Sequence, residues 1–218
     1  ILPFEQQWYA DRAIPYTYVG NPLAQKYAGM NGYASGGSIA LLPGSRAQEI
    51  ARLLPEFIAV AQSMPKQTFV LIRSESSVSL WPDRSLPANV EVFTGELKDG
   101  IKHCAAALVC SGTATLEVAL LGVPQLVVYR ANPISLAIAK RFVKISYFSL
   151  PNLILDAAAL PELLQENARA EALVQRLGAL LLDPSAQLNA YAQLRQLLEQ
   201  KDPAASAAQP ILTIASQS

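Results

Sequence analysis

Short apolar segments rich in Val, Ile and Leu recur as far as Tyr129, and segments of helical length follow most of them. The apolar segments are mostly continuous rather than alternating, which is typical of strands buried on both faces of a parallel sheet. We predict six strands: Tyr16–Val19, Ser38–Leu42, Thr68–Ile72, Val90–Phe93, Ala106–Cys110 and Gln125–Tyr129.

Helical periodicity appears between these strands. Apolar residues in Ala47–Met64 recur near the 3.6-residue period, and Pro55 is expected to kink this helix. The other predicted helices are Leu97–Cys104, Thr113–Leu121, Ile134–Lys144, Leu160–Gln165, Ala168–Leu182 and Ala186–Gln200. The alternation predicts an α/β fold: a doubly wound, mostly parallel six-stranded sheet with a helical C-terminal end.

Two segments carry no clear periodicity. The segment from Gly20 to Gly37 holds five of the eleven glycines, and we predict no regular structure for it. The tail Lys201–Ser218 is rich in Ala, Ser and Pro, so we expect it to be mobile.

The composition narrows the classes of protein. The 218 residues are 51% hydrophobic and 16% charged, too apolar for a disordered chain and enough for one sizeable domain. Lys and Arg total 17 and balance 17 Asp and Glu, so we exclude a protein that coats nucleic acid. No apolar run reaches the roughly 18–20 residues that span a bilayer, so we exclude an integral membrane protein. Because Ile1–Trp8 lacks a signal-peptide pattern, we expect a piece of a longer protein or a processed product.

The sequence offers no evident catalytic centre. Cys104 and Cys110 stand six residues apart beside a single histidine, His103, so we expect no metal site or disulfide framework. His103 has no acid or nucleophile at a useful spacing, and no Ser/His/Asp, paired-carboxylate or Walker-type motif is present. A general base is therefore not evident in this chain.

Two turns are candidates for anion binding. Ser45-Arg46 follows one predicted strand and Ser111-Gly112-Thr113 follows another, and ligands of open α/β sheets gather at the carboxyl ends of strands. In each turn a glycine lets the backbone approach a ligand, and the following helix N-terminus presents N–H groups to an anion such as pyrophosphate. Ordinary helix capping explains either turn as well.

Arg46 and Glu117 give further support to a ligand at these two turns. A cation beside a helix N-terminus opposes the helix dipole unless an anion is present, so Arg46 favours an anionic ligand. Glu117 lies four residues past Thr113, about one helical turn in, where a carboxylate could hold ribose hydroxyls. A solvated acid favoured by the helix dipole is the alternative for Glu117.

A third region differs in kind. Asn132–Phe148 places Lys140, Arg141 and Lys144 among large apolar side chains such as Phe142. Cations interleaved with apolar side chains suit the boundary between anionic headgroups and acyl chains, so we expect contact with a membrane surface. An ordinary amphipathic helix with a solvated basic edge is the alternative.

Several motifs combine into a wider pattern. In order, they are Leu2-Pro3-Phe4-Glu5, Leu41-Leu42-Pro43-Gly44-Ser45-Arg46 with Glu49, Cys110-Ser111-Gly112-Thr113-Ala114-Thr115-Leu116-Glu117, Tyr129-Arg130, Leu150-Pro151-Asn152-Leu153 and Pro161-Glu162-Leu163-Leu164-Gln165. In order and spacing, across residues 1–165, this pattern resembles the lipid A disaccharide synthase family. The helical end is similar only in character.

The resemblance implies an inverting glycosyltransferase of the GT-B type, with two Rossmann-like domains and no essential metal or other cofactor. Such enzymes transfer diacylglucosamine from its UDP derivative to 2,3-diacylglucosamine 1-phosphate and release UDP. The implied location is cytoplasmic, peripheral on the inner face of the bacterial inner membrane.

The resemblance also divides the chain. Residues 1–20 would be the last element of the N-terminal half and the hinge, residues 21–200 the nucleotide-sugar (donor) domain, and residues 201–218 the tail. The catalytic base and most of the acceptor site would lie in the absent N-terminal half, supplied in cis or by a second subunit.

Individual residues take roles from the same resemblance. The implied substrate-binding set is Ser45 and Arg46 for the donor diphosphate, Ser111, Gly112 and Thr113 for phosphate, Glu117 for the ribose, and Arg130 and Asn152 for the sugar side. The implied membrane-contact residues are Lys140, Arg141, Lys144 and Phe142.

The chain departs from the family pattern at a few positions, and two other hypotheses stay open. Asn21 replaces a Gly-His-Pro hinge, Asp156 and Ala157 replace a Gly-Arg pair, and Ala105 replaces a frequent Asp. The departures at the hinge and at the Gly-Arg pair favour a second hypothesis, a non-catalytic paralogue or fragment that keeps only UDP-sugar or membrane binding. A third is another GT-B enzyme acting on a UDP-sugar, such as the peptidoglycan transferase or an epimerase; those lack the stretch from Tyr129 to Asn152.

Overall fold

The computed structural model describes residues 2–3, 5–81, 85–130, 147–198 and 205–208. In these ranges six strands form one parallel sheet in the order β3-β2-β1-β4-β5-β6. The strands are β1 (Tyr33–Leu42), β2 (Phe69–Arg73), β3 (Val90–Thr94), β4 (Cys104–Cys110), β5 (Gln125–Tyr129) and β6 (Glu162–Leu164).

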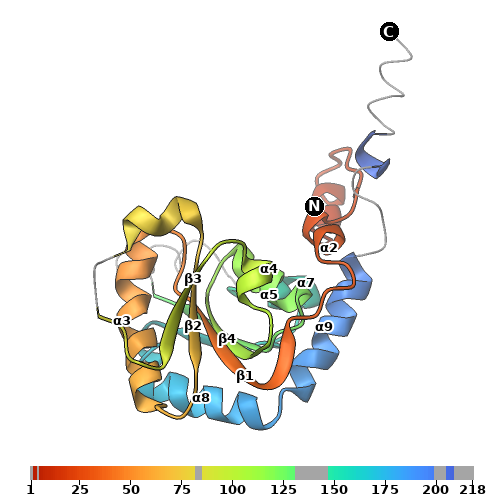
Figure 1. Ribbon diagram of the computed structural model, residues 1–218. Coiled ribbons are helices and arrows are strands. Elements are labelled where there is room, and N and C mark those ends of the chain that lie inside the picture. Colours follow the sequence, from red (N-terminus) through yellow and green to blue (C-terminus); the bar gives the residue numbers. More distant parts are fainter. Residues whose placement is uncertain (1, 4, 82–84, 131–146, 199–204, 209–218) are drawn as a thin grey trace.

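Helices cover both faces of the sheet, which confirms the doubly wound α/β prediction. The helices are α1 (Glu5–Ala10), α2 (Pro22–Lys26), α3 (Ala47–Ser63), α4 (Leu97–Gly100), α5 (Thr113–Leu120), α7 (Leu150–Leu155), α8 (Ala170–Leu182) and α9 (Ser185–Leu198), with 3-10 helices η1 (Glu75–Leu80) and η2 (Gln165–Asn167). Buried side chains of α3 and α8 pack on one face, and those of α2, α5, α7 and α9 pack on the other. Figure 1 shows α1 to one side of this layered body.

The central strands are buried on both faces. Every residue of β4 is buried, and in β1 Ile39 and Leu41 join the core under α3 and α8, whereas Ala40 and Leu42 join the core under α5. Successive side chains of a strand point to opposite faces, so a strand with two buried faces must be apolar throughout. This explains why the apolar segments of the sequence do not alternate.

The number of strands is as predicted, but one member of the sheet differs. The strand predicted at Tyr16–Val19 is wrong: this segment is irregular, and it leads through Gly20 and Asn21 directly into α2. Its place as sixth strand is taken by β6, which lies in the segment predicted to be the helix Leu160–Gln165. A strand of three residues is too short to show a period of two.

The glycine-rich segment Gly20–Gly37 is more ordered than predicted, since it contains α2 and the beginning of β1. Asn21 caps α2 with its side-chain oxygen, which accepts from the backbone of Leu23 and Ala24. The register between β1 and β4 shifts twice before Ile39, and a Cβ at Gly37 would overlap the carbonyl oxygen of His103. The glycine therefore permits close backbone contact between β1 and the turn before β4 instead of marking a flexible loop.

Most remaining helices were predicted correctly. The helices predicted at Ala47–Met64, Thr113–Leu121, Ala168–Leu182 and Ala186–Gln200 are confirmed as α3, α5, α8 and α9. The helix predicted at Leu97–Cys104 is too long, because α4 ends at Gly100 and β4 begins at Cys104. The helix predicted at residues 134–144 lies outside the described residues, as does most of the tail.

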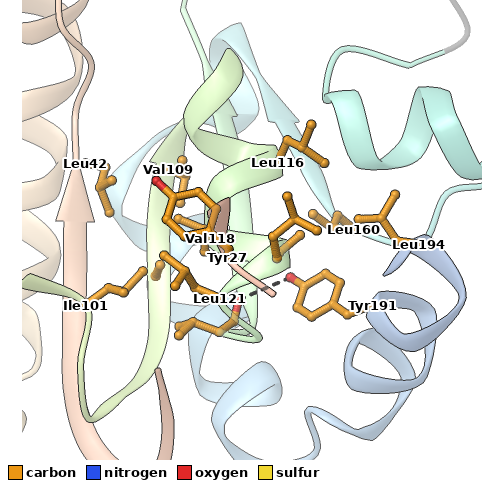
Figure 2. Packing of buried hydrophobic residues seen from close by; sticks show 14 of the residues in the cluster. Tyr27, Leu42, Ile101, Val109, Leu116, Val118, Leu121, Leu160, Tyr191 and Leu194 are labelled. Carbon is orange, nitrogen blue, oxygen red and sulfur yellow. Dashed lines mark hydrogen bonds between the residues drawn. The ribbon is translucent and has the colours of Figure 1, made fainter. Parts of the chain in front are cut away.

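A buried polar cluster joins β5 to α9. The side chain of Gln187 pairs with the backbone of Gln125: its Oε1 accepts from the N–H at 2.8 Å, and its amide donates to the C=O at 3.0 Å. The hydroxyl of Tyr191 lies 2.9 Å from Oε1 of Gln187 and 3.2 Å from the carbonyl oxygen of Val123, so its one proton has two acceptors. Figure 2 shows the ring of Tyr191 among the buried apolar residues. These bonds satisfy backbone groups at the beginning of β5 that neighbouring strands do not reach.

We predict that Gln187→Ala lowers the free energy of unfolding by about 2–5 kcal/mol, because it leaves two buried backbone groups unpaired. Urea denaturation followed by circular dichroism measures the change. Gln193→Ala, on the exposed side of the same helix, is the matched control and should stay within about 0.5 kcal/mol of the wild type. Equal losses in the two variants would contradict this account of the cluster.

Candidate functional site

The strand order brings two turns together. β1 and β4 are neighbours, yet β1 continues into α3 on one face and β4 continues into α5 on the other. At such a switch point the turns after the two strands diverge and leave a crevice at the carboxyl edge of the sheet. A pocket lies there, lined by Leu42, Gly44, Ser45, Arg46, Glu49, Ile72, Arg73, Ser74, Ser77, Gly95, Leu97, Cys110, Ser111, Gly112, Thr113, Ala114 and Glu117.

Six of the eight predicted substrate-binding residues line this one pocket. They are Ser45, Arg46, Ser111, Gly112, Thr113 and Glu117. They come from two turns far apart in the sequence, and each turn follows a central strand. The structure therefore gives the two candidate anion turns a common site.

The N-terminus of α5 forms one wall of the pocket. Its N-cap is Gly112, which has a φ of 153°, a value that favours glycine, and makes no side-chain capping bond. The hydroxyl of Thr115 donates to the carbonyl of Gly112 at 2.7 Å and thereby holds the first turn. Gly112 and Thr113 are exposed, so the opening of the helix faces the pocket. Helix N-termini with accessible N–H groups bind phosphates.

Ser111 is already engaged within the chain. Its hydroxyl donates to the carbonyl of Phe148 at 2.7 Å, and its N–H donates to the carbonyl of Val128 at 3.0 Å. Ser111 thus links the carboxyl end of β4 to β5 and to the segment that precedes α7. Its role as a phosphate donor stays a prediction, since its hydroxyl proton would first have to leave Phe148.

Glu49 supplies the anion that Arg46 was expected to need. The guanidinium of Arg46 lies 2.7 Å from Oε1 of Glu49, and Oε2 accepts from the N–H groups of Ser45 at 3.1 Å and Arg46 at 3.3 Å. A glutamate three residues past an N-cap often folds back in this way as part of a capping box. That spacing was a signal for the contact, although the sequence analysis gave Glu49 no role.

Gly44 makes room for this contact. Its φ is 115°, and a Cβ at this position would come within 2.6 Å of Cβ of Glu49. A side chain at position 44 would be strained in its backbone and would push Glu49 away from the turn. The conformation of the Ser45-Arg46 turn therefore depends on a glycine before it.

Glu117 lies one turn into α5 and lines the same pocket. Its Oε1 accepts a hydrogen bond of 2.6 Å from the hydroxyl of Tyr27, which follows α2. Burial and the hydrogen bond to Glu117 both raise the pKa of Tyr27 far above its ordinary value, so the hydroxyl stays protonated. The sequence analysis missed Tyr27, because 90 residues separate the two partners.

The sequence analysis also missed the residues that β2 and η1 contribute. Arg73 ends β2, and Ser74 and Ser77 follow it into the pocket. The guanidinium of Arg73 donates to the hydroxyl of Thr94 at 3.0 Å, which fixes it beside β3. The rule that ligands gather after strands applies to β2 as well, and it could have found Arg73.

Cys110 lies at the floor of the pocket, where burial raises the pKa of its thiol to about 12. The thiol therefore stays protonated near neutral pH and provides no thiolate nucleophile.

Two predicted residues, Arg130 and Asn152, do not line the pocket. Arg130 forms an ion pair with Glu56, whose other oxygen accepts from the N–H of Ala170 at 2.9 Å. Asn152 is buried, and its side-chain amide bonds the backbone of Leu160 in both directions, at 2.9 and 2.8 Å. Their assignment to the sugar side of a donor stays a prediction.

A carboxylate connects Asn152 to the segment before α7. Glu162 of β6 accepts from Asn152 Nδ2 at 2.8 Å, from the N–H groups of Phe148 at 2.8 Å and Ser149 at 2.9 Å, and from the hydroxyl of Ser149 at 2.7 Å. We call these four residues the Glu162 cluster. It joins the edge of the sheet to the beginning of α7.

Two features are absent from the described ranges, namely a membrane-spanning helix and a metal-binding cluster. No helix there is both long and apolar enough to cross a bilayer. No cluster of three or more His, Cys, Asp or Glu side chains occurs there in a metal-binding arrangement. The predicted membrane-contact residues Lys140, Arg141, Phe142 and Lys144 lie outside the described residues.

Solved glycosyltransferase structures share this fold. The spinosyn rhamnosyltransferase SpnG, complexed with thymidine diphosphate, superposes with a TM-score of 0.56 and 19% identity over 90% of this chain and 50% of that chain. The glycosyltransferase SnogD from Streptomyces nogalater gives a TM-score of 0.52 and 24% identity over 92% of this chain and 48% of that one. This chain therefore has the fold of about half of such an enzyme.

The sequence matches a narrower group. The family model described as "Lipid-A-disaccharide synthetase" matches residues 1–214. The lipid-A-disaccharide synthase of Pseudomonas entomophila is 36% identical over 232 residues, which cover 98% of this chain and 61% of the relative. That of Pseudomonas savastanoi pv. phaseolicola is 35% identical over 237 residues, which cover 100% of this chain and 62% of the relative. The chain thus spans about three fifths of the length of these curated relatives, and it belongs to the lipid-A-disaccharide synthase family.

Proposed function

We propose that this chain is the donor-binding part of a glycosyltransferase of lipid A biosynthesis. In this proposal the donor is the UDP derivative of diacylglucosamine, the acceptor is 2,3-diacylglucosamine 1-phosphate, and UDP is released. The observation that carries it is the single pocket that joins the open N-terminus of α5 with Arg46 and Glu117. A helix N-terminus suits a diphosphate, and a carboxylate one turn away suits ribose hydroxyls.

The same geometry suits the chemistry of transfer. When the bond between the anomeric carbon and the diphosphate oxygen breaks, negative charge grows on the departing UDP. The N–H groups of Gly112, Thr113 and Ala114 and the positive end of the α5 dipole would stabilise that charge where it develops. As the family resemblance implies, the general base would lie in the N-terminal part.

The comparisons support a nucleoside diphosphate as the ligand. One structural neighbour with the same fold is complexed with thymidine diphosphate, and the family relatives are lipid-A-disaccharide synthases. In the proposal, this chain binds the donor, and an N-terminal part, in cis or in a second subunit, supplies most of the acceptor site.

We propose further that the enzyme is peripheral on the inner face of the bacterial inner membrane, in the cytoplasm. Lys140, Arg141, Lys144 and Phe142 would form the contact, with cations toward anionic headgroups and Phe142 toward acyl chains.

A second candidate is a non-catalytic protein that keeps only the binding site. Asp156, in place of a glycine of the family pattern, adopts the left-handed region with a φ of 48°, and Ala157 stands where an arginine is common. The missing cation would weaken a contact to an anionic donor, and this favours the second candidate.

For the binding site, we predict that Thr113→Val weakens UDP binding about tenfold, because it removes a hydroxyl from the phosphate end without changing side-chain size. Isothermal titration calorimetry of the 218-residue chain measures the affinity. Thr68→Val is the matched control, since Thr68 precedes β2 at the opposite edge of the sheet, and it should leave the affinity unchanged. Absence of saturable heat with the wild type would refute a UDP site.

For the activity, we predict that this chain, combined with the N-terminal part of a relative, transfers diacylglucosamine and releases UDP. Thin-layer chromatography of radiolabelled acceptor follows the product. Product above that of either part alone dismisses the non-catalytic candidate, whereas UDP binding without product supports it.

For the membrane contact, we predict that reversing Lys140, Arg141 and Lys144 to Glu weakens co-sedimentation with anionic vesicles, and that salt weakens the wild type similarly. A control with the same change in net charge reverses the exposed residues Lys66, Lys102 and Arg176. If both triple variants bind as the wild type does, the surface contact is wrong.

A further inference from the structure

Tyr27 combines a buried ring with a hydroxyl at the edge of the proposed donor site. The residue is 2% exposed, and its ring belongs to the core cluster that also contains Leu116, Val118 and Leu121 (Figure 2). It immediately follows α2, and its N–H donates to the carbonyl of Leu23 at 3.0 Å. Both its ring and its backbone are thus held in place.

The hydroxyl of Tyr27 forms a hydrogen bond with one carboxylate oxygen of Glu117, a residue that lines the pocket. It donates to Oε1 of Glu117 at 2.6 Å, which is short for a hydrogen bond between a hydroxyl and an oxygen and typical of a charged acceptor. Among the described residues, none donates a hydrogen bond to Oε2. The contact therefore fixes one oxygen of the carboxylate and leaves the second as an acceptor at the pocket.

A glutamate side chain has three rotatable bonds and loses much rotamer freedom when a ligand orders it. Tyr27 imposes that order before a ligand arrives, because its own ring cannot move within the core. Its hydroxyl also stays protonated near neutral pH, since burial and the hydrogen bond to Glu117 raise its pKa, so the donor is present there. A preorganised acceptor costs a ligand less to bind.

We propose that Tyr27 is a positioning residue that holds Glu117 ready for the ribose hydroxyls of a nucleoside diphosphate. This inference rests on the proposed function, since it takes the pocket to be the donor site. It adds that discrimination for ribose depends on α2, an element outside the two turns that form the pocket.

We predict that Tyr27→Phe weakens UDP binding about tenfold, because the released carboxylate must be ordered by the ligand. Calorimetric titrations use three probes, namely UDP, 2′-deoxyuridine diphosphate and inorganic pyrophosphate. The wild type should prefer UDP to the 2′-deoxy analogue, and the variant should lose most of that preference. Pyrophosphate affinity should change less than twofold, because this probe does not reach Glu117.

Two further variants complete the test. Tyr33→Phe, at the beginning of β1 and away from the pocket, is the matched control and should bind all three probes as the wild type does. Glu117→Ala should also lose the preference for ribose, and adding Tyr27→Phe to it should weaken UDP binding no further, because no side-chain acceptor remains at position 117 for Tyr27 to hold. Glu117→Ala keeps the test available if Tyr27→Phe does not fold.

Failure of the UDP site and failure of the positioning role of Tyr27 give different results. If the wild type binds neither UDP nor pyrophosphate, the proposed function fails and this inference fails with it. If the wild type binds UDP but Tyr27→Phe lowers the affinity for all three probes by the same factor, Tyr27 only supports the fold. The positioning role is wrong if Tyr27→Phe retains the preference for ribose. It is also wrong if the double variant Tyr27→Phe with Glu117→Ala loses as much UDP affinity as the two single variants combined.

Discussion

The pairing of β1 with β4 is the contact on which the rest of the molecule depends. These strands share the longest register of the sheet, and the chain leaves them toward opposite faces. The pairing holds the N-termini of α3 and α5 at one edge, where the crevice opens. It requires small residues where the backbones converge, such as Gly37 beside the carbonyl of His103. It also requires a β4 that is apolar from Cys104 to Cys110, because helices cover both of its faces.

The fold could be predicted from the sequence wherever the signal is local. Continuous apolar segments identified five of the six strands, and helical periodicity identified α3, α5, α8 and α9. The sixth strand could not be found, because β6 has three residues and is defined by its pairing with β5 rather than by its pattern. Tyr16–Val19 has the composition of a strand, but the segment is irregular and leads into α2. The glycine-rich segment Gly20–Gly37 was predicted to be irregular, but Gly37 lies in β1 and allows the carbonyl of His103 to approach closely, a contact that only the tertiary structure reveals.

In the candidate site, too, only the residues with a local sequence signal could be predicted. Ser45, Arg46, Gly112, Thr113 and Glu117 could be grouped from the sequence, because each lies just after a strand or one helical turn later. Tyr27 lies 90 residues from its partner, and nothing in its neighbourhood marks the contact, so it could not be predicted. Residues grouped by resemblance, such as Asn152, can serve the packing of a family as much as its ligand. The side-chain amide of Asn152 makes three hydrogen bonds within the chain, to Leu160 and Glu162, so this position stabilises the fold.

The Glu162 cluster has a consequence for the order in which the chain assembles. β6 contributes a short ladder to the edge of the sheet, whereas the carboxylate of Glu162 accepts three hydrogen bonds from Phe148 and Ser149, which precede α7, and a fourth from Asn152 within α7. Without those donors, a partly buried charge would lie beside the sheet, which is costly. β6 and α7 should therefore fold and unfold together as one cooperative unit. Because Ser111 bonds Phe148 within that unit, the loss of α7 would also loosen the turn that begins α5.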